Sequence, residues 1–259
     1  MRRPQRFILI TLLFLIPLQA TVAENAPLPA PKTTSIPVKI GAFNTLSVRG
    51  AIAVEIQQLK VDQSNFFRLD GKQRSPVSMS VKDGTLYLHT DEEEATTKVT
   101  VGLHRLHRLI VDGAASVHTK QLTSSSLSID ANTSGRIELA GMFTLNRILS
   151  SGSGSIQIQW VDSPRLRIDG SGQSHIRLAG VVNSVEMRLR DESEFHGQYL
   201  RVDRMFIQTK KDALAKLLVN NSLRAFAYDN SNIYYYKRPA ELTEFTAGSG
   251  NILQLGWGQ

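Results

Sequence analysis

The feature that most constrains this chain is an apolar position that recurs every 19 or 20 residues through its second half. A small or short polar residue stands two places before each recurrence, and seven of the eight residues five places after it are apolar. The recurring residues are Val117, Ile137, Ile156, Ile176, Phe195, Leu214, Ile233 and Ile252. Because separate positions keep the same phase, the pattern indicates a structural repeat.

Within each period the local pattern is typical of β-structure. Residues 166–168 alternate apolar and polar, residues 169–172 (Asp-Gly-Ser-Gly) favour a bend, and residues 176–178 alternate again. Short strands and Gly/Ser bends at this period predict a parallel β-solenoid of about eight coils of 19–20 residues. One coil alone leaves its inward residues in water, whereas stacked coils about 4.8 Å apart bury them in a continuous column.

Residues 38–105 break this rhythm but still predict strands. Residues 45–56 alternate around a bend at Arg49-Gly50, and residues 98–103 form another alternating run. Asp83-Gly84 lies between two alternating runs, which is typical of a type I′ hairpin. We therefore expect an N-terminal antiparallel β cap over 38–105, which protects the edge of the first coil. The solenoid follows over 106–259, and the two parts form one continuous all-β domain, 38–259.

The N-terminus has the layout of an export signal. Three arginines precede an apolar run over residues 7–18, and Thr21 and Ala23 supply the small residues of a cleavage site. This run is too short to cross about 30 Å of hydrocarbon, so we expect a cleaved signal peptide over 1–23 and not a membrane anchor. The four prolines of residues 24–37 predict an extended leader. The protein is expected to be periplasmic, or secreted and associated with the cell surface.

Composition excludes several classes of function. The chain has no cysteine, which removes disulfides, thiolate metal sites and iron–sulfur clusters. Loss of residues 1–23 takes away three arginines and no acid, so the formal net charge falls from +7 to +4. No Lys/Arg-rich tract remains, and we expect no nucleic-acid partner. No second apolar run is long enough to span a membrane, so no transmembrane anchor is expected after cleavage.

Several stretches, in their order and spacing, resemble one bacterial family. They are residues 46–54 (LSVRGAIAV), 81–88 (VKDGTLYL) and 109–117 (LIVDGAASV), with Gly-Ser-Gly at 152–154 and 248–250. The chain is similar to the head GIN domain family of proposed auto-transporter adhesins, also known as a domain of unknown function. The resemblance covers roughly residues 38–257. It implies an exported, right-handed parallel β-helix with no established activity.

The repeat predicts which polar residues lie side by side, because residues one period apart become neighbours in a solenoid. Candidate catalytic groups can therefore be compared by their phase. His118 and Glu138 are one period apart, as are His175 and Glu194. We interpret both as polar contacts between coils, since no third orienting group is in phase with either pair.

Two further groups are interpreted in the same way. His104 and His107 are three residues apart, which in a strand sends their rings to opposite faces. Asp191, Lys210 and Asp229 share a phase and alternate in sign, which indicates a structural charge ladder. The sequence therefore predicts no catalytic residue, no cofactor-binding residue and no metal ligand, and we expect that the protein is not an enzyme.

A stripe of arginines is the first part of a candidate ligand surface. Its members fall on three successive coils near the strand before the bend, where they suit anionic glycans or lipid headgroups. They are Arg147, Arg165, Arg167, Arg188 and Arg190. Asp169 and Glu186 lie in the same band, so a self-neutralised face is the alternative.

An aromatic cluster is the second part. Alternation places Tyr234 and Tyr236 on one side of a strand and Tyr235 on the other. Tyr234 and Tyr236 can stack on a sugar or a protein partner. The alternative is a wide last coil that packs near Trp257.

The predicted function is that of an exported, non-enzymatic β-solenoid, an adhesin or envelope binding protein. It presents a repetitive polar face to a glycan or to an envelope or host protein. One alternative is a polysaccharide lyase or hydrolase of the β-helix type, for which fold-level analogy is the only support. Another is a periplasmic structural or stress-response protein.

Overall fold

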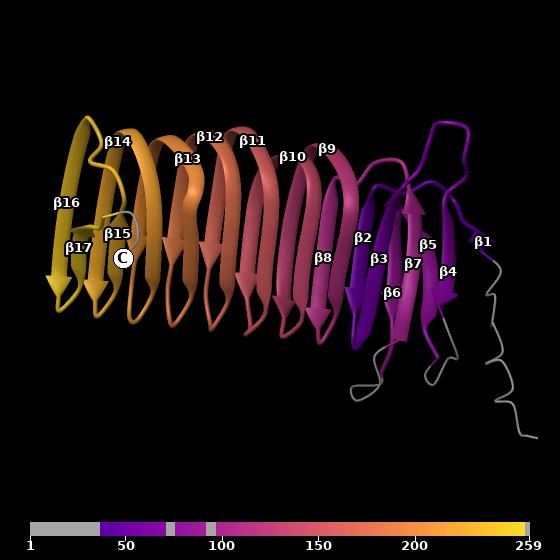
Figure 1. Ribbon diagram of the computed structural model, residues 1–259. Helices are drawn as coiled ribbons and strands as arrows, with labels where there is room; N and C mark the ends of the chain where they lie inside the picture. The colour runs from indigo at the N-terminus through magenta and orange to yellow at the C-terminus, as the bar shows by residue number, and fades with distance from the viewer. Residues whose placement is uncertain (1–36, 71–75, 92–96, 257–259) are drawn as a thin grey trace, which may run out of the picture. The chain divides into compact units, whose positions relative to one another are not determined.

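The computed structural model describes residues 37–70, 76–91 and 97–256, and every regular element within these ranges is a β-strand. The strands form a β-solenoid of about seven turns, whose coils stack side by side and pair mostly in parallel (Figure 1). All described residues belong to one compact unit, Thr33–Gln259. The predicted parallel solenoid is confirmed, with about seven turns where the repeat indicated about eight. The signal peptide predicted over 1–23, and the leader except for its last residue, lie outside the described residues.

Six long strands each run through most of one coil. They are β9 (Ser116–Thr133), β10 (Arg136–Ser151), β11 (Ser155–Gly170), β12 (His175–Leu189), β13 (Glu194–Thr209) and β14 (Leu214–Asp229). The following coil is divided into β15 (Asn232–Tyr235) and β16 (Glu241–Gly248), and β17 (Asn251–Gln254) begins the last. Each long strand pairs in parallel with its neighbours on both sides. Residues one period apart therefore lie next to each other.

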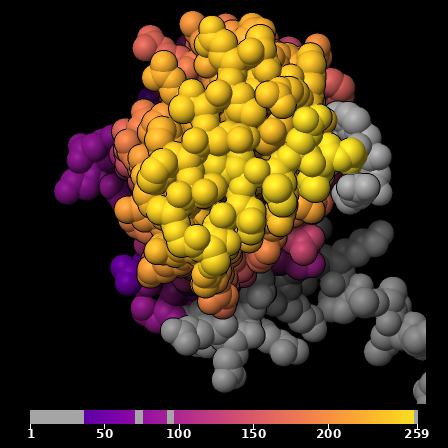
Figure 2. All heavy atoms as spheres, turned by 90° about the vertical axis from the view of Figure 1, so that its left-hand side faces the viewer, coloured from indigo at the N-terminus to yellow at the C-terminus, as the bar shows by residue number. Residues whose placement is uncertain are grey.

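The core is built from aligned columns of apolar side chains. The column that follows the bends consists of Val99, Val54, Val117, Ile137, Ile156, Ile176, Phe195, Ala215, Ile233 and Ile252. All but the last of these are buried. Figure 2 looks at the end formed by the last coils, where atoms fill the end face and no open channel through the described coils is visible. The stack is thus held together by a continuous dry interior.

One member of the predicted column is wrong, and two residues of a second column are exposed. Ala215, which is fully buried, pairs with Phe195, while the predicted Leu214 is half-buried and pairs with Glu194. A small residue beside a large one fits a close-packed core, so the apolar character of Leu214 was misleading. In the second column, five places after the first, Met142 and Val181 are apolar but are 66% and 41% exposed.

The N-terminal region combines parallel and antiparallel strands, and four of its strands belong to the parallel stack. They are β2 (Thr45–Arg49), β3 (Ile52–Gln58), β6 (Thr85–His89) and β7 (Thr97–Leu103). β2 pairs in parallel with β6 and with β8 (Arg108–Gly113), and β3 pairs in parallel with β7 and β9. The pair β2–β3 therefore lies between β6–β7 and the rest of the stack. Because chain order and spatial order differ here, the sequence period is interrupted although the architecture continues.

The antiparallel part is narrower than the predicted cap over 38–105. It consists of β1 (Val38–Lys39), β4 (Phe66–Asp70) and β5 (Ser78–Lys82). β4 pairs with β7 and β5 pairs with β6, and β1 adds to β4. The predicted hairpin is confirmed, since β5 and β6 flank Asp83 and Gly84, whose φ angles are 50° and 70°. These strands cover the parallel edge at the N-terminal end of the stack, as edge protection requires.

Each long coil also turns at a second corner, in the middle of the long strand. Gly141 and Gly180 occupy this corner with φ of 142° and 141°. A Cβ on either glycine would lie about 2 Å from a carbonyl oxygen of the preceding coil, so the backbones pass too closely for a side chain. Trp160 stands four residues after Ile156, as Gly141 and Gly180 stand four residues after Ile137 and Ile176, and its φ is 61°. In strand register, however, Gly180 faces Val161 and not Trp160.

Candidate functional site

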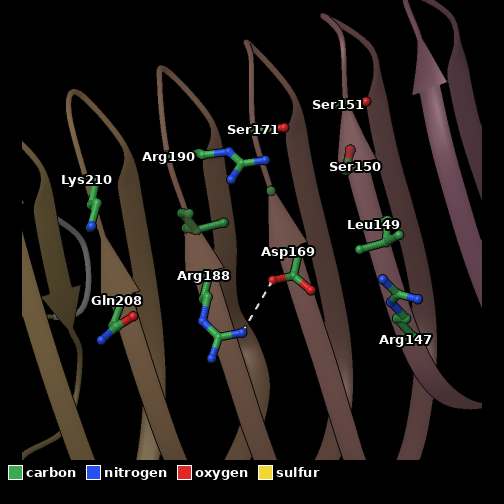
Figure 3. A pocket seen from close by; sticks show the side chains of 12 residues that line it. Arg147, Leu149, Ser150, Ser151, Asp169, Ser171, Arg188, Arg190, Gln208 and Lys210 are labelled. Carbon is green, nitrogen blue, oxygen red and sulfur yellow. Dashed lines mark ion pairs between the residues drawn. The ribbon is translucent and has the colours of Figure 1, made fainter.

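A basic groove crosses the strands that lead into the bends of four consecutive coils (Figure 3). It has a volume of about 470 Å³. Arg147 of β10, Arg188 of β12, Arg190 just after β12 and Lys210 just after β13 supply its cations, and Asp169 of β11 is the one acidic residue in its lining. Strand alternation explains the arrangement, because Leu189 is buried between the exposed Arg188 and Arg190.

Ion pairing leaves this groove positively charged. Asp169 accepts a 2.9 Å bond from Nε of Arg167, which raises the pKa of that guanidinium further, and it lies 3.9 Å from Nη1 of Arg188. Arg188 also contacts Glu186, at 2.7 Å. Arg147 and Arg190 have no ion pair among the described residues. Among the described residues, neither guanidinium therefore has a carboxylate within ion-pair distance, although the charge of Arg190 helps to lower the pKa of the neighbouring Asp191.

The predicted arginine stripe is thus brought together only in part. Arg147, Arg188 and Arg190 share the groove, whereas Arg165 and Arg167 are not part of its lining. Arg167 is held by Asp169, which is the self-neutralised arrangement that the sequence left open. Lys210 lies in the groove, with Nζ 5.4 Å from the centroid of the Tyr228 ring.

The predicted charge ladder between Asp191 and Asp229 is present, but its lysine is Lys211 and not the predicted Lys210. Nζ of Lys211, not of Lys210, lies 2.5 Å from Asp191, and the backbone N–H of Lys211 donates to Asp229 at 3.0 Å. The hydrogen bond from Lys211, followed by one from the Gly172 backbone, lowers the pKa of Asp191. The sequence favoured Lys210 because two adjacent lysines cannot be told apart by phase.

The predicted histidine pairs form between coils. His118 lies 3.5 Å from Glu138, and His175 lies 3.4 Å from Glu194. His196 adds a 2.9 Å contact to Glu194, which lowers the pKa of that carboxyl. Within the residues that the structure describes, no three His, Asp or Glu side chains gather in an arrangement that could hold a metal ion.

The tyrosine cluster alternates as predicted. Tyr235 points inward and is buried, and this burial raises the pKa of its phenol. Tyr234 and Tyr236 are half-buried on the other side, and neither lines the basic groove. Trp257, the proposed packing partner, lies outside the described residues.

A second surface was missed by the sequence analysis. Four large apolar side chains on four consecutive coils are exposed at the second corner, and we call them the aromatic corner: Met142 (66%), Trp160 (71%), Val181 (41%) and Tyr199 (67%). They line a groove of about 1190 Å³, whose floor includes the buried Ile158 and Leu178. The signal that could have located it was the glycine at Gly141 and Gly180, four residues after the inward column.

A bulge explains why Trp160 points outward. Ile158 pairs with Leu178 and Val161 pairs with Gly180, so Gln159 and Trp160 together face the single residue Ala179. An extra residue of this kind bends a strand and redirects a side chain. Because of this bulge, Val161 pairs with Gly180 and not with Val181, although Val161 and Val181 share the same phase of the sequence repeat.

Comparison with known proteins agrees with the architecture. The family model described as "Putative auto-transporter adhesin, head GIN domain" matches residues 42–239. No match is found among curated protein sequences. The described part of the chain contains no helix that could cross a membrane.

Several solved structures share the fold. One is named "Putative lipid binding protein" from Parabacteroides distasonis, with 17% identity, coverage of 85% of this chain and 96% of that chain, and a TM-score of 0.75. A "putative adhesin" from the same species has 19% identity, 86% and 96% coverage, and a TM-score of 0.75. A "putative adhesin" from Parabacteroides merdae has 18% identity, 86% and 95% coverage, and a TM-score of 0.73. The family model covers most of the solenoid, and the chain belongs to the head GIN domain family.

Proposed function

We propose that this protein is an exported, non-enzymatic binding protein that holds an anionic glycan along the basic groove. The single observation that carries the proposal is the row of cations Arg147, Arg188, Arg190 and Lys210, which outnumber the one carboxylate of the groove lining. Aligned cations of this kind attract anionic groups and raise their local concentration.

The dimensions of the groove favour a polymer over a small ion. Arg147 and Lys210 are three coils apart, which corresponds to about 14 Å along the stack. The lining residues come from four consecutive coils (Figure 3), so a chain bearing carboxylate, sulfate or phosphate groups can lie across several coils. The N-terminal sequence supports an exported location, and the names of the family and of the similar structures refer to adhesion or lipid binding.

The experiment compares dextran sulfate and polygalacturonate with neutral dextran. We expect the purified protein to bind the two anionic polymers, with an affinity that falls as salt rises. The double variant Arg188→Gln/Arg190→Gln should lose most of this affinity. The matched control Arg165→Gln/Arg224→Gln removes the same charge from exposed positions outside the groove and should bind nearly as the parent does.

Equal losses in the two double variants would show that net charge alone drives binding, which contradicts the proposal. Equal binding of neutral dextran would contradict it too. Release of shortened or unsaturated products from polygalacturonate would instead support the lyase or hydrolase alternative.

A further inference from the structure

We propose that the aromatic corner is a second binding site, separate from the basic groove, which takes the pyranose rings of a neutral glycan lying along the solenoid axis. The site goes beyond the proposed function, because it uses different residues and a different ligand chemistry. It is formed at the second corner of β10 to β13, whereas the basic groove lies at the strand ends next to the bends.

Trp160 is held outward by the backbone itself. Its φ of 61° lies in the left-handed region, which is unfavourable for a bulky residue. The ring is 71% exposed, so the core does not require it. A strained residue that contributes little to packing points to a role outside folding.

The flat faces of Trp160 and Tyr199 are open. Other aromatic residues of this solenoid pack on each other between coils in tilted pairs: the ring centroids of the half-buried Phe206 and Phe226 lie 5.5 Å apart, and those of Phe226 and the exposed Phe245 lie 6.2 Å apart. Among the described residues no ring packs on Trp160 or Tyr199. Their faces are therefore free to stack on the C–H face of a sugar.

The spacing of the two rings fits an extended glycan. Tyr199 pairs in register with Ala179, which in turn faces the bulge that contains Trp160. The two aromatic residues are thus two coils apart, about 9.6 Å along the axis, with only the small Ala179 between them. That separation is close to the length of one disaccharide unit in an extended polysaccharide, so both rings can engage one chain.

Polar side chains around the two rings can form hydrogen bonds with the hydroxyl groups of a sugar. The groove lining includes Gln157, Gln159, Asp162, Arg177 and Arg201. Within the described residues, the side chains of these five have no hydrogen bond or ion pair. An apolar platform with a few free donors and acceptors is typical of a small-molecule or sugar site. Arg177 and Arg201 outnumber the carboxylate of Asp162, so charge alone does not separate a sugar from an anionic membrane surface, and the test below includes vesicles for this reason.

The test uses the fluorescence of Trp160. The chain has two tryptophans, so Trp257→Phe leaves Trp160 as the only one. We expect cellohexaose, chitohexaose or xylohexaose to shift its emission to shorter wavelength, with an affinity at least tenfold above that of the corresponding monosaccharide. In the parent background, measured by calorimetry, Trp160→Gly and Tyr199→Ala should each weaken hexasaccharide binding at least tenfold. Tyr87→Ala, at a 44% exposed tyrosine of β6, should not.

Separate outcomes distinguish this site from the basic groove. Trp160→Gly should retain dextran sulfate binding, and Arg188→Gln/Arg190→Gln should retain hexasaccharide binding. If no hexasaccharide changes the emission or binds in calorimetry, or if Trp160→Gly binds as the parent does, the proposal is overturned. It is also overturned if the emission shifts with vesicles of phosphatidylcholine and phosphatidylglycerol but not with the sugars, because the corner would then be a membrane contact.

Discussion

The left-handed conformation of Trp160 makes a quantitative prediction when glycine and alanine are compared at the same place. A non-glycine residue in this conformation is disfavoured by about 1–2 kcal/mol, and alanine keeps that penalty while glycine does not. Glycine loses about 0.5–1 kcal/mol because its unfolded chain is more flexible. We therefore expect Trp160→Gly to be more stable than Trp160→Ala by about 0.5–1 kcal/mol.

Met142 supplies the matched control on the neighbouring coil. It is 66% exposed, similar to Trp160, but its φ is not positive. The order should therefore reverse, with Met142→Gly less stable than Met142→Ala by about 0.5–1 kcal/mol. Both Trp160 variants also lose the buried part of the ring, less than a third of its surface. At roughly 60 Å² this loss is worth about 1.5 kcal/mol and cancels in the comparison of glycine with alanine.

The free energies of unfolding can be measured by urea titration followed by circular dichroism. For a domain of this size, 1 kcal/mol corresponds to about 2–4 °C in melting temperature, so thermal scans provide a second readout. If glycine is the less stable residue at both positions, the strain at Trp160 does not exist. The argument that the ring is held outward at a cost to folding then fails.

Four other changes test the fold, the basic groove and the contacts between coils. Ile176→Asp places a charge in the fully buried column and should cost several kcal/mol, so melting should be lost or strongly lowered. Ser171→Asp, at a half-buried bend, should fold normally but weaken dextran sulfate binding, because it adds a carboxylate to the basic groove; equal melting temperatures for these two variants would contradict the assigned phase. Gly180→Ala should destabilise by more than about 1 kcal/mol in urea titrations, since its Cβ would lie 2.0 Å from a carbonyl oxygen. The pKa of Glu194 is lowered from 4.5 mainly by the hydrogen bond with His196, so its stabilising effect is complete above pH 4.5 and is lost as the pH falls through the lowered value. Glu194→Gln should therefore lose less thermal stability than the parent on acidification below pH 4.5, and parallel curves would exclude this contribution.

The architecture could be read from the sequence because a solenoid repeats the same physical demand in every coil. The inward position at Ile137, Ile156 and Ile176 must be apolar, and Asp83-Gly84 can adopt the hairpin turn without help from distant residues. Local rules of this kind need no knowledge of the partner strand.

Two of the errors concern a shift of one residue. Leu214 was preferred to Ala215, and Lys210 was preferred to Lys211, because a period of 19 or 20 residues leaves the register open by one place. Met142 is apolar and yet exposed, because register irregularities in β10 change which residues face the core, and such irregularities leave no local signal in the sequence.

The two grooves differ in how far they could be predicted. The arginine spacing located the basic groove, but only the register shows that Arg188 and Asp169 are paired neighbours. The aromatic corner depends on the backbone conformation of one residue, Trp160, and on the bulge that contains it. The sequence shows the tryptophan, but it does not show the bulge that directs the side chain outward.

Because the coils repeat at a regular spacing, the length of the stack is set by the number of coils. Each additional coil would lengthen the stack by about 4.8 Å and add one position to both grooves while leaving the existing positions in place. Duplication or deletion of a single coil would therefore lengthen or shorten both grooves by one position. The antiparallel layer of β1, β4 and β5 fixes the N-terminal end, so such changes would be accommodated between β9 and β14, away from the specialised end.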